Sequence, residues 1–163
     1  MTRLVLAAVL AAMACFGAEP DFWTRLRATI EQDLGRPYVW GATGMKSFDC
    51  SGFVWRVYTD SGVLLKRTTA RKLWFSLPEP MPGRRYAFGN LVFFDDLKHV
   101  GIVDTSGAFY HAETSAGTNR SRFDPYWRPK VAGVRAVALE QAASSARSFI
   151  QSSRSTAESS TSS

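Results

Sequence analysis

The segment Phe48-Asp49-Cys50-Ser51-Gly52-Phe53-Val54 decides the fold, because it places a cysteine where a loop becomes a helix. From Phe53 to about Thr59, apolar residues recur at the spacing of one helical face, and Asp49 is a good N-cap for a helix whose first turn holds Cys50. This position is the positive end of a helix dipole, where the pKa of a thiol can fall and favour the nucleophilic thiolate. Cys50 is therefore a candidate nucleophile.

Two further helices are predicted, one on each side of this segment. Asp21 can cap the first, which is expected to end at Gly35 and Pro37. Thr68 or Thr69 can cap the second, a short helix followed by a proline-rich connection. The apolar residues on these helices are Phe22, Trp23, Leu26, Ile30 and Leu34 in the first and Leu73, Trp74 and Phe75 in the second.

The second half of the chain has the pattern of strands. Strands are predicted at 91–94, 100–103 and 108–112, followed by a last apolar run at 131–139. Helices followed by strands indicate an α+β domain, in which N-terminal helices pack on a C-terminal antiparallel β-sheet. We expect this domain to span residues 19–140 and a Ser-rich, disordered tail to occupy residues 141–163.

Residues 1–18 have the features of an export signal. Arg3 supplies a positive start, residues 4–13 are apolar, and Ala12-Met13-Ala14 has the small-x-small pattern of a cleavage site. The apolar run is too short to cross a bilayer. We expect cleavage near residues 14–18 and export to the periplasm, the cell envelope or the medium. The alternative is a short apolar N-terminal helix.

Cys15 allows a second interpretation, in which it is the lipid-bearing first residue of a bacterial lipoprotein. Such signals resemble this one, although they have leucine where this chain has Ala12. Lipidation of Cys15 is the only membrane contact that we expect. If Cys15 is removed or acylated, Cys50 is an unpaired and potentially reactive cysteine in a compartment where disulfides form. An inert buried Cys50 and a Cys15–Cys50 disulfide are the alternatives.

The chain is basic, with a formal net charge of +6. A basic surface suits polyanions, which outside the cytoplasm are cell-wall polymers or anionic lipids. A generally solvated basic face is an equally good explanation. The cationic residues cluster at 66–72, but no nucleic-acid-binding motif accompanies them, so a nucleic-acid partner is not expected.

The two histidines of the chain, His99 and His111, both lie in the strand half. A cysteine nucleophile needs a base that takes its proton, and the base needs a third group that holds its imidazole. Cys50, His99 and His111 can fill these three roles, since a second imidazole can orient the first. Either histidine taken alone is better explained as an ordinary surface or core residue.

Strand geometry imposes a condition on this triad. A plain two-residue turn at Ser106 and Gly107 would pair Ile102 with His111 and leave His99 on the opposite face, since side chains alternate along a strand. The triad therefore predicts an odd-length loop or a β-bulge between the two strands, for which Gly107 is a suitable residue.

The chain carries a series of motifs in a fixed order: Tyr38-Val39-Trp40-Gly41, Phe48 to Val54, Arg67-Thr68-Thr69, Gly89 to Phe94, His99 to Val103, Phe109-Tyr110-His111-Ala112 and Tyr126-Trp127. Taken together, these motifs resemble the NlpC-type family of cell-wall cysteine peptidases. The resemblance covers nearly everything from about Asp21 to Leu139, and its Asp-Cys-Ser-Gly, His-Val-Gly-Ile and aromatic-His-Ala segments are specific in order and spacing. The chain departs from the family pattern at Phe88 and Asn90, which are structural changes in a turn, and at Ala42 and Lys72, which are expected near the cleft and bear on substrate detail more than on catalysis.

The resemblance implies a papain-like fold in which Cys50 is the nucleophile, His99 the base and His111 the orienting residue. It further implies hydrolysis of an amide bond in peptidoglycan stem peptides, either D-γ-glutamyl to diaminopimelate or a cross-link between stems. It places Tyr38, Asp49 and Ser51 in the substrate site. Physically, Tyr38 could donate to a developing oxyanion together with the Cys50 N–H, and Asp49 could instead be only a helix cap.

Two other functions remain open on this fold. The acyl-enzyme could pass its acyl group to an amine or a lipid, which would make the protein an acyltransferase. A non-catalytic cell-wall-binding module is the third possibility, although an intact set of Cys50, His99 and His111 argues against it. We expect no cofactor and no metal, because no closely spaced pair of ligands accompanies the histidines. A monomer is expected.

Overall fold

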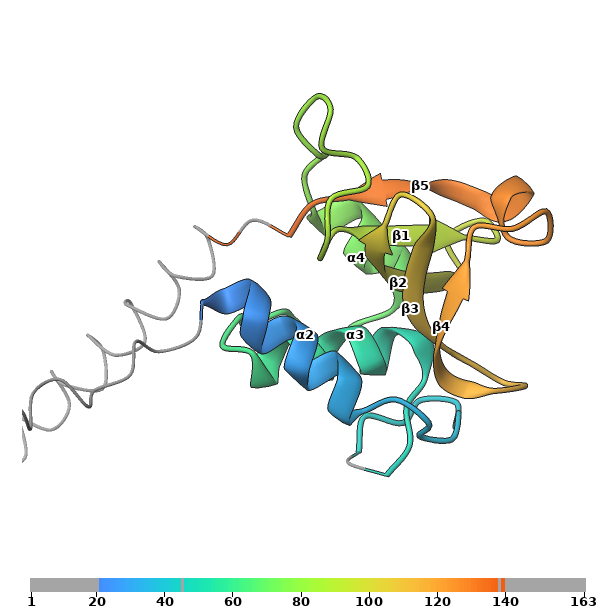
Figure 1. The fold of residues 1–163 in the computed structure, drawn as a ribbon. Helices are drawn as coiled ribbons and strands as arrows, with labels where there is room; N and C mark the ends of the chain where they lie inside the picture. Colours follow the sequence, from blue (N-terminus) through green and yellow to red (C-terminus); the bar gives the residue numbers. More distant parts are fainter. Residues whose placement is uncertain (1–20, 45, 138, 140–163) are drawn as a thin grey trace, which may run out of the picture.

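The computed structural model describes residues 21–44, 46–137 and 139, so the predicted export signal and tail lie outside the described residues. The described chain forms a group of helices followed by a five-stranded sheet, which confirms the predicted α+β class (Figure 1). Within the same residues, no helix is both long and apolar enough to cross a membrane.

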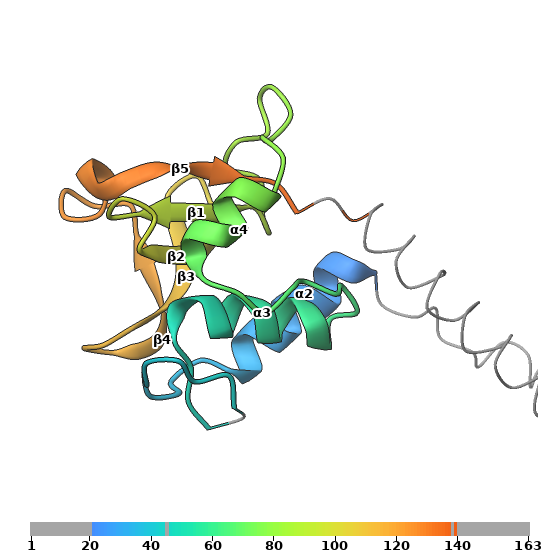
Figure 2. The ribbon, with the colours of Figure 1, turned by 180° about the vertical axis from the view of Figure 1, so that it is seen from behind.

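In the described part of the chain, three α-helices precede the sheet: α2 (Phe22–Gln32), α3 (Cys50–Asp60) and α4 (Ala70–Ser76). Each begins at a side chain that accepts backbone N–H groups of the first turn, namely Asp21, Asp49 and Thr69. These caps confirm the predicted helix starts. Helices α2 and α3 lie side by side, while α4 lies over β1 and β5, as the view from behind shows (Figure 2).

The sheet consists of β1 (Leu91–Phe94), β2 (His99–Thr105), β3 (Ala108–Glu113), β4 (Gly117–Arg122) and β5 (Val131–Arg135). All neighbouring strands are antiparallel, in the order β4-β3-β2-β1-β5. Strand β5 is preceded by a 3₁₀ turn, η1 (Arg128–Lys130), and is shorter than the predicted run at 131–139. The sequence did not predict β4. Its residues are mostly polar because it is an edge strand with alternate side chains exposed.

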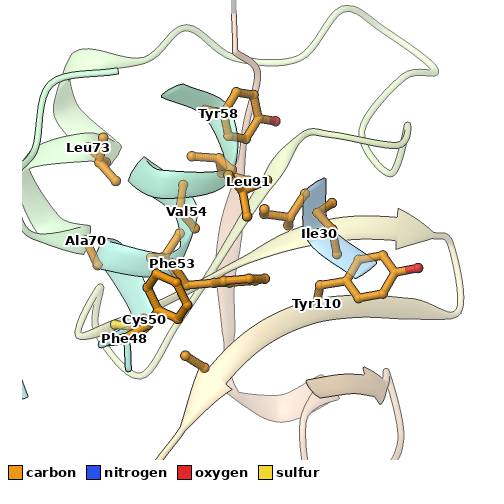
Figure 3. Packing of buried hydrophobic residues seen from close by; sticks show 14 of the residues in the cluster. Ile30, Phe48, Cys50, Phe53, Val54, Tyr58, Ala70, Leu73, Leu91 and Tyr110 are labelled. Atoms are coloured by element: carbon orange, nitrogen blue, oxygen red, sulfur yellow. The ribbon is translucent and has the colours of Figure 1, made fainter. Parts of the chain in front are cut away.

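Two apolar clusters cover the two faces of the sheet. The larger one lies between the sheet and the helices and includes Phe48, Phe53, Val54 and Tyr58, with Cys50 at its edge (Figure 3). The smaller one lies on the opposite face and comprises Val92, Phe94, Val103, Phe109, Phe123, Trp127 and Val134. Since β1 to β3 are buried on both faces, their register is strongly specified.

A bulge between β2 and β3 sets the register on which the predicted triad depends. Thr105 pairs with Ala108 across a two-residue turn, but beyond Asp104 the pairing shifts, so that Ile102 faces Tyr110. Continued along the strands, this register places His99 and His111 on one face of the sheet. The predicted bulge is therefore confirmed, at Asp104 and not at Gly107.

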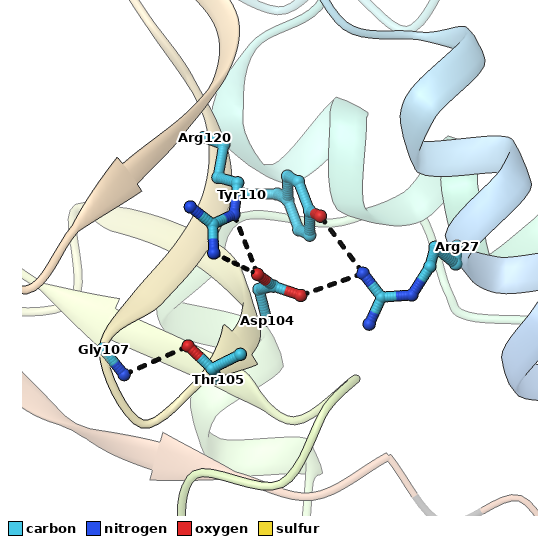
Figure 4. Close-up of polar contacts among 6 residues, drawn as sticks. All are labelled: Arg27, Asp104, Thr105, Gly107, Tyr110 and Arg120. Carbon is cyan, nitrogen blue, oxygen red and sulfur yellow. Dashed lines mark hydrogen bonds and ion pairs between the residues drawn. The ribbon is translucent and has the colours of Figure 1, made fainter.

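The carboxylate of Asp104 anchors this bulge to two other elements. Arg27 on α2 donates to one oxygen over 3.0 Å, and Arg120 on β4 donates to the other over 2.8 and 2.6 Å (Figure 4). Arg27 also lies 3.3 Å from the hydroxyl of Tyr110 on β3. Because Asp104 is buried, its charge requires such partners, and they hold the bulged residue in place.

Candidate active site

Cys50 is the first residue of α3, and its side chain reaches the N-terminal end of β2. The residue is 8% exposed. Its sulfur lies 3.9 Å from the carbonyl oxygen of Lys98, and the backbone N–H of Val100 hydrogen-bonds the same sulfur. The helix N-terminus thus holds the thiol against the backbone on both sides of His99.

The thiol is neutral in the resting protein. Burial raises the pKa of Cys50, and the charge of Asp49 acts in the same direction, whereas the N–H of Val100 lowers it. The sequence led us to expect a lowered pKa from the helix N-terminus. The structure gives the opposite direction because burial outweighs the favourable dipole, so formation of the thiolate requires a base that removes the proton.

The two imidazoles are hydrogen-bonded to each other. Nε2 of His99 lies 2.9 Å from Nδ1 of His111, and His111 is fully buried. The ring of Trp127 stacks on His99, with 5.6 Å between ring centroids, and meets His111 edge to face at 4.9 Å. These contacts fix both rings from the side, so the structure brings together the two predicted histidines.

Both imidazoles are neutral at pH 7. Burial lowers the pKa of His99 to about 4, with Asp95 raising it and Lys130 lowering it further. Burial and the neighbouring charge of His99 lower the pKa of His111 to about 3, against a small upward effect of Asn119. A neutral imidazole retains one nitrogen lone pair, so His99 can accept a proton at neutral pH.

These lowered pKa values predict that the protein loses stability in mild acid. The unfolded chain binds protons at its histidines below about pH 6.5, whereas the folded protein does so only near pH 4 and pH 3. The histidine contribution is therefore complete above pH 6.5 and is lost as the pH falls through the folded-state values. We expect a lower urea midpoint at pH 5 than at pH 7, and a smaller difference in His111→Gln. Equal midpoints in the wild type would contradict this expectation.

Asp49, Ser51 and Arg67 form a compact cluster beside Cys50. One oxygen of Asp49 accepts from the Gly52 N–H over 2.5 Å and from the Ser51 hydroxyl over 3.0 Å. Its other oxygen accepts from Nη2 of Arg67 over 2.9 Å, while Nη1 of Arg67 lies 2.9 Å from the Ser51 hydroxyl oxygen. Arg67 thereby offsets a negative charge that would oppose formation of the thiolate.

Burial raises the pKa of the Tyr38 phenol, and Cys50, once it is ionised, and Asp49 raise it further. Tyr38 and His99 line the same cleft, which has a volume of about 280 Å³ and also includes Glu113, Tyr126 and Trp127. Within the part of the chain that the structure describes, no group of three His, Cys, Asp or Glu side chains is arranged to hold a metal ion.

Sequence reasoning assigned no role to several residues that the structure places at this site. Ser121 hydrogen-bonds Nε2 of His111 over 2.9 Å and belongs to the unpredicted strand β4. Arg67 and Trp127 were noted only as parts of motifs. A basic residue after the nucleophile helix and an aromatic residue before the last strand were the available signals, but neither signal shows which side chain the residue contacts.

Comparison with known proteins gives a consistent result. Residues 35–136 match the model of the NlpC/P60 family. The "Probable peptidoglycan endopeptidase LytE" of Bacillus subtilis is 32% identical over 106 residues, which are 63% of this chain and 30% of that protein. The "Probable endopeptidase YafL" of Escherichia coli is 31% identical over 121 residues, covering 69% of this chain and 49% of that protein. The chain thus spans less than half of the length of either relative.

Among solved structures, an NLP/P60 family protein from Staphylococcus aureus, described as similar to a lipoprotein, has a TM-score of 0.63 and 28% identity. The match covers 76% of this chain and 44% of that one. Residues 35–136, which match the family model, include Cys50, His99 and His111.

Proposed function

Because this chain belongs to the NlpC/P60 family, we propose that it is an exported cysteine peptidase that hydrolyses an amide bond in peptidoglycan stem peptides. The observation that carries this proposal is the position of the Cys50 sulfur against the backbone that flanks His99, whose imidazole is hydrogen-bonded to His111. The thiol is buried and neutral and lies against the strand that bears a neutral imidazole, and transfer of its proton to such an imidazole would generate the nucleophile.

The proposed reaction begins with transfer of the Cys50 proton to His99. The sulfur then attacks the carbonyl carbon of the amide, and a tetrahedral oxyanion forms. When the C–N bond breaks, the proton on His99 passes to the leaving amine, and a thioester remains on Cys50. His99 then deprotonates a water molecule, and the resulting hydroxide attacks the thioester carbon. The C–S bond breaks and the carboxylic acid leaves. The Cys50 thiolate takes back its proton from His99. His111 holds His99 in place throughout.

Tyr38, Asp49 and Ser51 are proposed to contact the substrate. The phenol of Tyr38 stays protonated because its pKa is raised, so it can donate to the oxyanion together with the backbone N–H of Cys50. Both oxygens of Asp49 already accept hydrogen bonds inside the protein, so capping of α3 is at least part of its role. The Ser51 hydroxyl and the positively charged guanidinium of Arg67 are polar groups that suit the carboxylates of a stem peptide.

The remaining parts of the proposal concern the chain outside the catalytic domain. We propose that residues 1–18 direct export, with lipidation of Cys15 as the alternative to simple secretion, and that residues 19–140 form the peptidase domain. Peptidoglycan is the proposed partner, and the protein is proposed to act as a monomer. The D-γ-glutamyl to diaminopimelate bond and a cross-link between stems are the two candidate bonds.

The test is to incubate the protein with muropeptides of defined sequence and to identify the products by mass spectrometry, beside a folded Cys50→Ala control. Cleavage that the control lacks is the expected result, and the product masses identify the bond. Transfer of the acyl group to an added amine without hydrolysis would favour the acyltransferase. Binding to intact wall without turnover in either protein would favour the non-catalytic module.

A further inference from the structure

Beyond His111, a line of hydrogen bonds continues from β3 onto the edge strand β4. Nε2 of His111 lies 2.9 Å from the hydroxyl oxygen of Ser121, which lies 3.0 Å from Oδ1 of Asn119. Nδ2 of Asn119 donates in turn to a carboxylate oxygen of Glu113 over 2.9 Å. The proposed mechanism uses none of these three side chains, so their arrangement calls for another explanation.

The direction of this line is set by the amide of Asn119. Its nitrogen faces two acceptors, the carboxylate of Glu113 at 2.9 Å and the backbone carbonyl of Gly117 at 3.1 Å. An amide oxygen in the same place would face two oxygens and accept from neither. Oδ1 of Asn119 therefore points at Ser121, and the hydroxyl of Ser121 donates to it.

Since a serine hydroxyl has only one proton, Ser121 must accept at its contact with His111. Nε2 of His111 then carries the ring proton, and Nδ1 carries a lone pair. This lone pair lies 2.9 Å from Nε2 of His99, which is consequently the protonated nitrogen of His99. Both rings are neutral at pH 7, so each has a single N–H. Nδ1 of His99 is left without a proton.

The charge of Glu113 favours the same direction. Its carboxylate oxygen lies 3.9 Å from Nε2 of His111, which is too far for a hydrogen bond but close enough to favour an N–H dipole that points toward it. His111 is fully buried and the Glu113 side chain is only 26% exposed, so water screens this attraction incompletely.

We propose that Ser121, Asn119 and Glu113 are positioning residues, which fix the tautomers of His111 and His99 so that Nδ1 of His99 takes the thiol proton. The proposal rests on the proposed function, because it identifies the proton acceptor in that reaction. In the opposite tautomer, Nδ1 of His99 would already hold a proton and could not accept one from Cys50. That tautomer would also deprive Oδ1 of Asn119 of the proton that Ser121 donates.

The tautomers can be measured directly by ¹⁵N NMR of the imidazole nitrogens, because the chain contains only two histidines. At pH 7 we expect both rings of the full-length wild type to carry the proton on Nε2. Ser121→Ala removes the acceptor, and Asn119→Ala frees the Ser121 hydroxyl to donate to His111. Both variants are expected to populate the Nδ1–H tautomers, whereas Ser121→Thr, which keeps the hydroxyl, is expected to retain the wild-type spectrum.

Kinetics on a cleaved stem peptide provide the second readout. In Ser121→Ala and Asn119→Ala we expect kcat to fall by about 10- to 100-fold with KM unchanged, below the loss of about 10⁴-fold that a fully wrong tautomer can cause. Ser121→Thr is expected to restore kcat. Ser106→Ala removes a hydroxyl in the β2–β3 turn, outside this line, and is expected to change neither the tautomers nor kcat.

A wild-type His99 with its proton on Nδ1 would overturn the proposal, as would unchanged tautomers in Ser121→Ala and Asn119→Ala. If one of these variants does not fold, the other tests the same direction of donation. The NMR measurement needs no substrate. A protein that cleaves nothing but whose tautomers respond as expected would therefore contradict the proposed function, while the assignment of the tautomers to Ser121 and Asn119 would stand.

Discussion

Replacing Cys50 with alanine is expected to reduce hydrolysis of stem peptides by about 10⁶-fold, which is the size of loss known for removal of a covalent nucleophile. The remaining groups of the site could still bind the substrate and polarise its carbonyl, but no atom would be left to form the thioester. The side chain lies at the edge of the larger apolar cluster, so the loss of one sulfur atom should leave the fold intact.

His99→Ala provides the matching half of a double-mutant cycle. A general base contributes up to about 10⁴-fold, and the loss should be near this limit because burial raises the pKa of the thiol and leaves little thiolate without a base. The double variant Cys50→Ala/His99→Ala is expected to be no less active than Cys50→Ala alone, since every proton transfer by His99 in the proposed reaction belongs to the route through the Cys50 thioester. Single-turnover kinetics on one defined muropeptide measure all four proteins.

An independent, additive loss in the double variant would contradict this scheme, because it would show that His99 acts on a reaction that does not pass through Cys50. Cleavage by Cys50→Ala at the wild-type rate would exclude the thiol mechanism. Urea unfolding of each variant verifies that a loss of activity does not reflect a loss of fold.

Gly52→Ala is expected to lower both stability and activity, although alanine is the better helix former by about 1 kcal/mol. A Cβ atom on Gly52 would collide with the backbone carbonyl oxygen of Ala42. That carbonyl accepts from the Asp49 N–H over 3.1 Å, and so cannot move away without breaking the start of α3. Overpacking of this kind costs about 1–3 kcal/mol, which outweighs the gain in helix propensity.

The activity of Gly52→Ala should fall further than its stability suggests. The displaced segment includes Asp49 and Cys50, and a shift of about 1 Å in a catalytic group can reduce the rate about 100-fold. Gly44→Ala is the matched control, because Gly44 lies in the segment that leads to α3 but has open space around its Cβ position. Urea midpoints and kcat/KM of both variants test the prediction. Wild-type values for Gly52→Ala would refute it.

The sequence was informative wherever a local pattern has one structural meaning. Asp21, Asp49 and Thr69 or its neighbour were predicted as helix caps because a short polar side chain before an apolar periodic run satisfies N–H groups that the helix itself leaves free. The bulge was predicted because strand alternation allows His99 and His111 to share a face only if one residue is added. Its location at Asp104 could not be predicted, since it depends on Arg27 and Arg120 from other elements.

Strand β4 shows the opposite case. Its sequence, Gly117 to Arg122, has no apolar alternation, because it pairs on one side only and exposes alternate residues. Periodicity therefore gave no signal for the strand, and Asn119 and Ser121 were missed together with it. Ser121 contacts His111 only because β4 pairs with β3, and Asn119 contacts Ser121 along β4. Polar partners of a buried imidazole are specified by three-dimensional position and not by spacing in the chain.

The sequence by itself determined the helix cap at Asp49, the cysteine and the two histidines of the candidate site, the order of helices and strands, and the family. Each of these follows from residue type and local spacing, which do not depend on contacts between distant segments of the chain. Only the tertiary structure decided the protonation of the site, because the pKa of Cys50 and of each histidine depends on how completely other segments bury it. The same holds for the hydrogen bonds that orient the imidazoles, since the residues that make them lie on different strands.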